Sequence, residues 1–326
     1  MGKSLKKLYV IMGPTGIGKT DLLYRYLSQK PNLFEVISVD SRQIYKFMPI
    51  GTATPEPYVK EKIPHYLVEF LEPDQIYSAG NFVKDAERLI NDIWERNKIP
   101  ILCGGTGFYF KAFYTGMFFL EEDKERKQKI KKMLDEMTEE ERLKELQKID
   151  PDSISKENQS IRKGIIHPND KYRIYRSLEL YYLTGKTLRM HYLILNQKQK
   201  LWEFEGIFII PEKEKWERQL KIRAEKMVHM GFIKEALYIF KKYGNCPALK
   251  TPGYKETYDL YQKFGDKILY DNNLKNDIIS ILYKTHKKYG KMQLKWFKNE
   301  KALKHVSYKE AEKFLENILN ITLRKD

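Results

Sequence analysis

A glycine-rich stretch near the N-terminus has the residue types and spacing of a phosphate-binding loop. Glycines let successive backbone N–H groups face a phosphate, a lysine can reach the outer phosphate, and a hydroxyl can hold Mg²⁺. The motif predicts a bound diphosphate or triphosphate, which kinases, ATPases, GTPases and enzymes that transfer another group from a diphosphate ester all use. The residues that fit the pattern GxxxxGK[ST] are Gly13, Pro14, Thr15, Gly16, Ile17, Gly18, Lys19 and Thr20.

Polar residues follow two further apolar runs of the chain. Asp40 comes directly after residues 34–39, and Thr106 follows residues 99–103 within the sequence GGTG. Because the carboxyl ends of parallel strands face the ligand crevice of a doubly wound sheet, we expect Asp40 near the phosphate-binding loop. The Thr106 hydroxyl would face the same crevice. An aspartate that caps a turn and a glycine-rich strand exit would explain each residue equally well on its own.

The apolar pattern predicts an α/β fold with a P-loop NTPase-like parallel sheet core. Residues 8–12, 34–39 and 99–103 are continuous apolar runs, which are typical of buried parallel strands. Residues 78–97 carry apolar side chains at spacings of three and four behind Ser78, which indicates an amphipathic helix with a serine N-cap. Strand, helix and strand in this order favour a doubly wound sheet.

The character of the chain changes after Gly116. A segment rich in Lys and Glu covers residues 123–149, with a capping box that begins at Thr138, and another helix is expected from about residue 170 to Gly185. We therefore expect a small inserted helical domain at residues 118–200. Residues 205–210 would return to the sheet as a strand, so the core would consist of residues 1–117 and 201–326, with a helical C-terminal part.

The amino-acid composition narrows the classes of molecule that the protein could bind. The 326 residues include 60 Lys and Arg against 44 Asp and Glu, and the net charge of +16 favours a polyanion such as nucleic acid. The two cysteines, Cys103 and Cys246, indicate neither a disulfide framework nor a zinc site. No stretch approaches the ~20 apolar residues of a membrane span. These features predict a cytoplasmic protein without a membrane partner.

Segments spread over almost the whole chain resemble the tRNA dimethylallyltransferases, also called tRNA isopentenyltransferases or IPP transferases. The matching segments are GPTGIGKT (13–20), DSRQIYKFMPIGTATP (40–55), PHYL (64–67), YSAGNF (77–82), IPILCGGTGFYFKA (99–112), IHPNDKYRIYRSLELYYLTGK (166–186) and PGYKE (252–256). The resemblance implies that the loop holds dimethylallyl diphosphate with Mg²⁺, so that a label of ATP binding would mislead. The dimethylallyl group would go to N6 of adenosine 37, which is 3′ to the tRNA anticodon, and give N6-(dimethylallyl)adenosine.

The resemblance also implies roles for single residues. Asp40 would be the general base for the exocyclic amine of adenine, and Thr106 would contact the same base. Arg223, in a late helix, would bind the diphosphate together with the loop. The tRNA, through its anticodon stem-loop, would contact Asp40, Ser41, Arg42, Gln43, Thr106, Arg126, Tyr172, Arg173, Ile174, Tyr175 and Arg176.

A two-faced helix is expected near the C-terminus. One face carries Lys284, Lys287, Lys288, Lys291, Lys295 and Lys298, and the opposite face carries Ile278, Leu282, Tyr289, Met292 and Trp296. In the light of the resemblance the lysines would follow RNA phosphates, which predicts a steep salt dependence of tRNA binding. His286 and Met292 depart from the family signature TRxYAKRQxTWF, so no role is carried over to them.

Two other functions share the phosphate-binding loop. An adenylate isopentenyltransferase performs the same chemistry on free AMP, ADP or ATP, but lacks the HPND-type insertion and the long basic C-terminal half. A P-loop small-molecule kinase would instead turn over the γ-phosphate of ATP. We favour a monomeric, Mg²⁺-dependent prenyltransferase that acts on tRNA.

Overall fold

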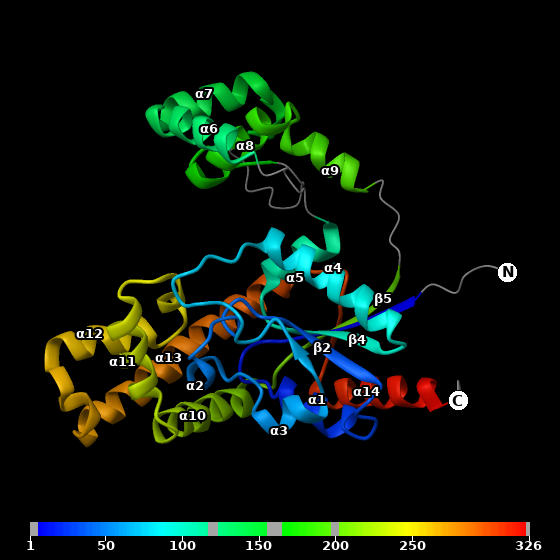
Figure 1. Ribbon diagram of the computed structural model, residues 1–326, viewed down its shortest axis with the longest axis vertical. Coiled ribbons are helices and arrows are strands. Elements are labelled where there is room, and N and C mark those ends of the chain that lie inside the picture. The colour runs from blue at the N-terminus through cyan, green and yellow to red at the C-terminus, as the bar shows by residue number, and fades with distance from the viewer. Residues whose placement is uncertain (1–5, 117–122, 155–164, 197–201, 324–326) are drawn as a thin grey trace. The chain divides into compact units, whose positions relative to one another are not determined.

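The computed structural model describes residues 6–116, 123–154, 165–196 and 202–323. The chain divides into two compact units, one of residues 1–113 and 201–326 and the other of residues 114–200. Figure 1 shows a sheet between helices in the first unit and helices alone in the labelled part of the second. The boundaries expected from the sequence, at 117–118 and 200–201, fall on residues outside the described ranges.

The described part of the first unit is built on a six-stranded parallel sheet with the strand order β3-β2-β4-β1-β5-β6. The strands are β1 (Lys6–Met12), β2 (Phe34–Val39), β3 (His65–Tyr66), β4 (Ile99–Gly104), β5 (Trp202–Ile209) and β6 (Lys304–Val306). The predicted α/β fold with a parallel P-loop-like core is confirmed. All four strands that the sequence predicted are present as β1, β2, β4 and β5, whereas β3 and β6 have only 2 and 3 residues and leave no pattern to detect.

Helices pack on the sheet and beside it, with cores of apolar side chains between them. One core lies between the sheet and helices α1 and α14, and another joins α10 to α13 with the segment after β2, including Ile44 and Met48. The helices are α1 (Lys19–Leu27), α2 (Pro49–Thr52), α3 (Pro57–Lys62), α4 (Ala79–Glu95), α5 (Gly107–Thr115), α10 (Lys213–His229), α11 (Phe232–Tyr243), α12 (Tyr254–Phe264), α13 (Asn272–Phe297) and α14 (Tyr308–Leu323), with 3-10 helices η2 (Pro247–Lys250) and η3 (Gly265–Leu269). As predicted, Ser78 caps α4 by accepting a hydrogen bond from the Asn81 N–H at 3.1 Å.

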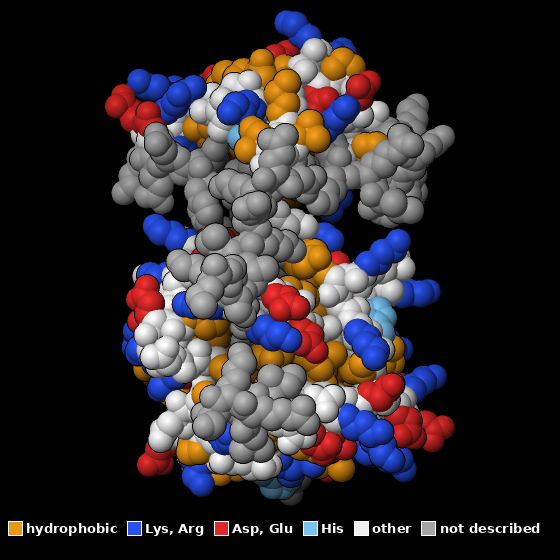
Figure 2. All heavy atoms as spheres, turned by 90° about the vertical axis from the view of Figure 1, so that its right-hand side faces the viewer, with side chains coloured by type: hydrophobic (Ala, Val, Ile, Leu, Met, Phe, Trp, Pro, Cys, Tyr) orange, Lys and Arg blue, Asp and Glu red, His pale blue; other side chains and the backbone are white. Residues whose placement is uncertain are grey.

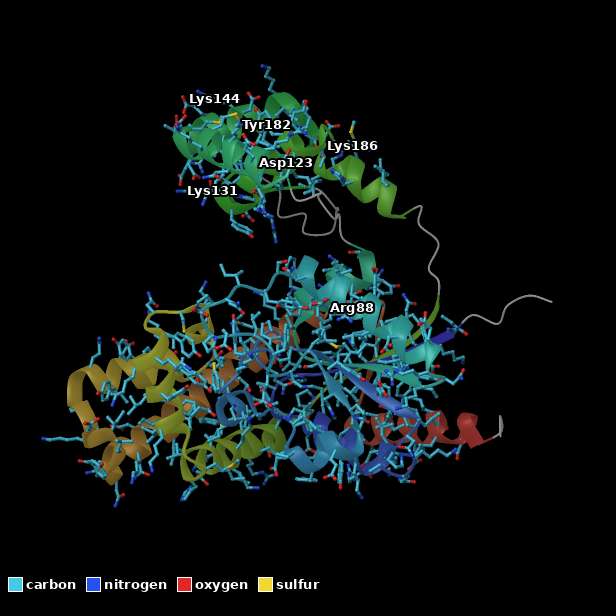
Figure 3. The ribbon with its side chains drawn as sticks, in the orientation of Figure 1. Arg88, Asp123, Lys131, Lys144, Tyr182 and Lys186 are labelled. Carbon is cyan, nitrogen blue, oxygen red and sulfur yellow. The ribbon has the colours of Figure 1, made fainter. Side chains whose placement is uncertain are left out.

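The second unit is a small group of helices around its own apolar core, which includes Leu134, Leu146 and Leu178. Its elements are α6 (Lys124–Glu136), α7 (Glu139–Ile149), η1 (Pro151–Ser153), α8 (Lys171–Thr184) and α9 (Leu188–Asn196). Asp123 and Thr138 cap α6 and α7, as Figure 3 shows for Asp123 at the start of α6. Among the helices described in either unit, none has the length and apolar character needed to cross a bilayer.

The lysine-rich helix is present as α13, but its packed face differs from the prediction. Ile278 and Leu282 are buried as expected, whereas Met292 and Trp296 are 58% and 40% exposed. The packed face continues instead through His286, Gly290, Gln293 and Phe297. The cause is Trp216 of α10, whose indole ring leaves no room for a Cβ atom at Gly290. A count of apolar side chains misses a face on which a glycine and polar residues are buried.

A buried carboxylate fixes the start of β2. Glu35 is 1% exposed and accepts hydrogen bonds from Arg96 at 2.5 and 2.6 Å, Lys98 at 2.6 Å and Tyr66 at 2.8 Å. Burial raises the pKa of Glu35, but the hydrogen bonds from Arg96, Lys98 and Tyr66 outweigh it and lower the pKa to about 2. The carboxylate therefore links three successive strands and α4 at the end of the sheet opposite the strand carboxyl ends.

Replacing Glu35 by glutamine should destabilise the protein by about 3 kcal/mol near neutral pH, because the charged partners lose their carboxylate. Since the folded-state pKa is depressed from 4.5, the wild-type stabilisation is present above pH 4.5 and is lost as the pH falls toward about 2. Thermal unfolding of both proteins between pH 7 and about pH 3 measures the difference. A difference that does not shrink with falling pH would contradict this account.

Candidate active site

Three loops meet at one edge of the sheet because their strands are neighbours. Gly104, at the end of β4, pairs in register with Met12 of β1 on one side and Val39 of β2 on the other. A Cβ atom at Gly104 would lie 2.2 Å from the Val39 carbonyl oxygen, so only glycine fits there. The phosphate-binding loop, residues 40–43 and residues 104–106 therefore follow from adjacent strand ends.

A pocket of ≈ 230 Å³ lies at this edge. It is smaller than the roughly 300–1,000 Å³ of sites for drug-sized ligands, which suits a compact phosphorylated molecule. Residues that the sequence singled out and that line it are Thr15, Gly16, Gly18, Lys19, Thr20, Asp40, Gln43 and Arg223. Gly13, Pro14 and Ile17 belong to the loop but do not line the pocket, and Ile17 packs into the sheet core. Apolar groups of Ala53, Val59 and Cys103 share the lining.

The loop has the backbone that a phosphate cradle needs. Gly16 and Gly18 adopt φ angles of 76° and 85°, which side chains other than hydrogen disfavour, and α1 begins directly at Lys19. The Lys19 ammonium group folds back and donates hydrogen bonds to the carbonyl oxygens of Gly13 at 2.8 Å and Pro14 at 3.0 Å. Burial lowers the pKa of Lys19, while Cys103 and Asp40 raise it and Arg223 lowers it further.

Arg223 of α10 brings a second cation to this pocket. Its Nε atom is buried without a hydrogen-bond partner among the described residues. Burial lowers the pKa of Arg223 to about 10, against the opposing effect of Asp40 and Asp21. A buried guanidinium with an unused donor that lines an open pocket is arranged for an anionic ligand.

Asp40 and Thr106 are held by short hydrogen bonds at the ends of β2 and β4. The Arg42 N–H donates to Asp40 Oδ1 at 2.8 Å, which leaves the second carboxylate oxygen outside that turn. The Ser41 N–H donates to Thr106 Oγ1 at 2.9 Å, and the Thr106 hydroxyl lies 3.3 Å from Ser41 Oγ. The two residues are thus tied to one another through Ser41. Arg42 also carries a buried Nε without a partner among the described residues.

Gln43 is occupied with protein partners. Its side-chain carbonyl accepts from Ser38 Oγ at 3.0 Å, and its amide donates to the carbonyl oxygens of Ala53 at 2.9 Å and Thr52 at 3.4 Å. Glu235 holds the nearby helix α2 by accepting hydrogen bonds from the N–H groups of Ile50 at 2.9 Å and Gly51 at 2.8 Å. Gln43 therefore shapes the wall of the pocket, and the tRNA contact expected for it stays a prediction.

Within the described residues, no three His, Cys, Asp or Glu side chains are grouped as metal ligands. Mg²⁺ does not need such a cage, because it keeps several waters and is often bound by substrate phosphates and one or two protein oxygens. Thr20, in the first turn of α1, lines the pocket together with Asp21 and Asp40. This set of oxygen donors fits Mg²⁺ that arrives with a diphosphate.

The remaining expected tRNA contacts belong to the second unit. Tyr172 is 74% exposed on α8, and Arg173 and Arg176 are exposed beside acidic neighbours, Asp170 and Glu179. Ile174 is 3% exposed and its side chain lies in the core of this unit, so the tRNA contact expected at this position stays a prediction that its side chain does not support. The helical spacing that exposes Tyr172 and Arg176 turns Ile174 inward. Two other residues expected to contact tRNA, Arg126 and Tyr175, donate hydrogen bonds within this unit. Arg126 donates to the Tyr182 carbonyl at 3.0 Å, and the Tyr175 hydroxyl donates to Asp135 at 3.0 Å.

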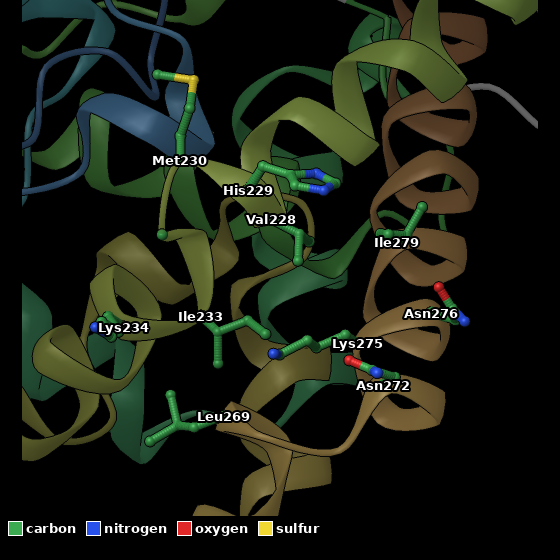
Figure 4. Close-up of a pocket in the computed structure, with 11 residues that line it drawn as sticks. Val228, His229, Met230, Ile233, Lys234, Leu269, Asn272, Lys275, Asn276 and Ile279 are labelled. Atoms are coloured by element: carbon green, nitrogen blue, oxygen red, sulfur yellow. The ribbon is translucent and has the colours of Figure 1, made fainter.

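Charge and cavity size alone do not point to the site. On the face shown in Figure 2, Lys and Arg side chains are interspersed with Asp and Glu, so the excess of +16 is not gathered into one patch there. A larger pocket of ≈ 800 Å³ lies elsewhere, among α10, α11 and α13 (Figure 4). Its lining mixes Met230, Ile233 and Leu269 with Lys234 and Asn272 and includes no Asp or Glu. The smaller pocket is the one that combines phosphate-binding groups with a carboxylate.

Comparison with known proteins agrees with this geometry. The family model for IPP transferase matches residues 43–300, which is most of the chain. The chain belongs to the IPP transferase family. A tRNA dimethylallyltransferase of Natranaerobius thermophilus is 30% identical over 98% of this chain and 92% of its own length, and that of Halothermothrix orenii is 34% identical over 91% and 86%. The resemblance noted in the sequence is confirmed.

Solved structures of other IPP transferase family members have the same fold. A tRNA isopentenylpyrophosphate transferase of Staphylococcus epidermidis superposes with a TM-score of 0.64 and 28% identity over 98% of this chain and 100% of that one. A eukaryotic dimethylallyltransferase acting on tRNA gives a TM-score of 0.72 and 29% identity over 90% of this chain and 70% of that one.

Sequence reasoning missed two residues that hold this IPP transferase's phosphate-binding loop. Gln293 of α13 accepts from the Thr15 N–H at 2.8 Å and donates to the Gly105 carbonyl at 3.0 Å, so it joins two of the three loops. The Trp216 indole N–H donates to the Thr15 carbonyl at 2.8 Å. Gln293 is 5% exposed within a lysine-rich helix, and a buried polar residue of that kind becomes visible only once its partners are known.

Replacing Gln293 by leucine should weaken the binding of inorganic diphosphate about tenfold, because Thr15 and Gly105 lose their common partner and the loop is less well ordered. The unpaired backbone groups should also lower the free energy of unfolding by about 1–3 kcal/mol. Calorimetric titration and thermal unfolding measure the two effects. Gln262→Leu, on the exposed side of α12, is the matched control, and equal diphosphate affinity in the two variants would overturn the role of Gln293.

Proposed function

We propose that this chain transfers the dimethylallyl group of dimethylallyl diphosphate to N6 of an adenosine in tRNA. Membership of the IPP transferase family and its tRNA dimethylallyltransferase relatives support this activity. The structural observation that carries the proposal is a single pocket in which a phosphate-binding loop and Arg223 face Asp40. The target is adenosine 37, 3′ to the anticodon, and the product is N6-(dimethylallyl)adenosine.

The cationic end of the pocket binds the diphosphate. Backbone N–H groups of residues 16–20, at the N-terminus of α1, supply partial positive charge, and Lys19 and Arg223 supply full charges. As the allylic C–O bond breaks, negative charge grows on the diphosphate oxygens, so these groups stabilise the transition state more than the ground state. Ala53, Val59 and Cys103 offer an apolar lining for the five-carbon tail, and burial raises the pKa of Cys103 to about 11, which keeps it a neutral thiol.

Asp40 is the general base for the nucleophile. The N6 lone pair of adenine is delocalised into the ring, so attack on the allylic carbon is aided by a carboxylate that orients the amine and accepts its proton. A C–N bond forms, the C–O bond to the diphosphate breaks, and the N6 proton passes to Asp40. Thr106, tied to Asp40 through Ser41, contacts the adenine ring edge and fixes its orientation.

The Thr20 hydroxyl would hold Mg²⁺ together with the substrate phosphates, and the ion would neutralise part of the diphosphate charge. The exposed residues of the second unit, Tyr172, Arg173 and Arg176, are suited to the anticodon stem-loop by stacking and charge. The helical unit itself, residues 114–200, is proposed as a tRNA-contacting domain. Action as a monomer in the cytoplasm remains our prediction.

The two alternatives are less well supported. An adenylate isopentenyltransferase would use free AMP, ADP or ATP, whereas the relatives that match along the chain are named for tRNA. A small-molecule kinase uses the same loop but needs a hydroxyl or similar acceptor placed in line with a γ-phosphate.

Incubating the protein with labelled dimethylallyl diphosphate, Mg²⁺ and either tRNA or AMP should place the label on tRNA alone. Nucleoside digestion of the product should give N6-(dimethylallyl)adenosine from a single position. Label on AMP, or γ-phosphate turnover from ATP at a comparable rate, would refute the proposal.

Replacing Asp40 by asparagine should lower kcat by about 10²- to 10⁴-fold, since the base is lost while Oδ1 still accepts from the Arg42 N–H. Affinity for tRNA and for the diphosphate substrate should change little. Single-turnover transfer together with filter binding of tRNA separates the two effects. Asp266→Asn, at an exposed position in η3, is the matched control. If Asp40→Asn loses tRNA binding but keeps its turnover per bound tRNA, the assignment of Asp40 as the base is contradicted.

A further inference from the structure

An exposed apolar surface lies where α13 packs on the GGTG segment that contains Thr106. It consists of Phe108, Met292 and Trp296, which are 63%, 58% and 40% exposed. Single exposed apolar side chains are ordinary, and others occur on this protein. These three differ because they are neighbours: Phe108 follows Gly107, Gly107 packs on the Trp296 ring, and Met292 lies one turn before Trp296 on α13.

Contacts between α13 and the GGTG segment fix this surface next to the candidate catalytic residues. Gln293 donates to the Gly105 carbonyl at 3.0 Å, and a Cβ atom at Gly107 would lie 2.3 Å from the Trp296 ring. One turn earlier, burial raises the pKa of the Tyr289 hydroxyl, and the nearby side chains of Thr106 and Ser41 oppose this effect. Positions 289, 293 and 296 thus run along the segment that contains Thr106, and the same segment begins at Gly104, which lines the pocket that contains Asp40.

The Trp296 ring is held rigidly although part of it is open. Gly107 covers it on one side, and the Phe297 ring meets it edge to face with centroids 5.0 Å apart. An aromatic ring that is already ordered loses little conformational entropy when a base stacks on it. The indole therefore offers a preformed platform beside the pocket.

The charge around this surface is positive. Lys288, Lys291 and Lys295 are exposed on the same two turns of α13. Within the described ranges none of the three forms an ion pair, whereas Lys287 is paired with Glu217 at 2.7 Å. Aromatic rings flanked by free ammonium groups match a ligand with both flat bases and phosphates.

We propose that Phe108, Met292 and Trp296 form the surface on which the unpaired nucleotides next to the target adenosine stack, with the neighbouring lysines on their phosphates. The inference rests on the proposed function and adds to it the place where the RNA strand lies against the core unit. The target base must leave its stack to reach Asp40, and its former neighbours then need new stacking partners. A surface that adjoins the pocket supplies those partners where the strand enters.

Replacing Phe108 by serine, and separately Trp296 by leucine, should raise the Kd and KM for tRNA about tenfold or more, in line with the loss of one stacked base. The KM for dimethylallyl diphosphate and the affinity for inorganic diphosphate should stay within about twofold of wild type, because the diphosphate site is intact. Trp296→Phe should recover most of the tRNA affinity, since it keeps an aromatic face. Steady-state kinetics with both substrates and filter binding of tRNA give these values.

Tyr270→Ser is the matched control, because Tyr270 is 77% exposed but lies at the C-cap of η3, outside this surface. Wild-type tRNA affinity in both Phe108→Ser and Trp296→Leu would overturn the inference, as would an equal loss for both substrates. If the wild-type protein transfers no label to tRNA, the proposed function fails instead, and the two failures are distinct.

A second experiment tests the lysines through the salt dependence of tRNA binding. Lys295→Gln should reduce the slope of the logarithm of the tRNA binding constant against the logarithm of the salt concentration by about 0.7 if the ammonium group contacts a phosphate. An unchanged slope would show that Lys295 is not part of the binding surface.

Discussion

The backbone contact at the carboxyl ends of β2, β4 and β1 is the constraint on which the candidate site depends. The Val39 carbonyl accepts from the N–H groups of Gly105 at 3.2 Å and Thr106 at 3.0 Å, and the Gly13 N–H donates to the Gly104 carbonyl at 3.1 Å. Three loops are therefore joined by main-chain hydrogen bonds, which do not depend on side-chain identity. This leaves the side chains of the pocket available for a ligand.

The C-terminal helices complete a site whose recognisable motifs lie in the first third of the chain. α10 supplies Arg223 and the Trp216 contact to Thr15, and α13 supplies Gln293. Burial and the nearby Arg223 lower the pKa of His286 to about 4, so this histidine is neutral at physiological pH and adds no like charge beside the guanidinium. Packing of α10 against α13 thus determines both the position and the electrostatic surroundings of the anion site.

Features encoded by neighbouring residues were predictable from the sequence, and those that depend on distant partners were not. The continuous apolar runs predicted β1, β2 and β4, and Ser78 and Thr138 predicted the starts of two helices. Strand burial and helix capping leave a pattern in residues that are close in sequence. The inward turn of Ile174 and the exposure of Met292 and Trp296 were missed, since they depend on which neighbour packs against the helix. Gln43 was expected on RNA because of its motif, but its hydrogen bonds to Ser38 and Ala53 need the folded loop to be seen.

The position of Lys19 has a consequence for the affinity of the loop for phosphate. Two of its three N–H donors already bond to the Gly13 and Pro14 carbonyls, so a phosphate meets this cation through the remaining donor or by replacing a hydrogen bond of the loop itself. The same two oxygens compete with any phosphate group for Lys19, whether it belongs to an ester or to free diphosphate. The loop thereby contains its own competitor for the cation, which moderates how tightly a phosphate ligand is held.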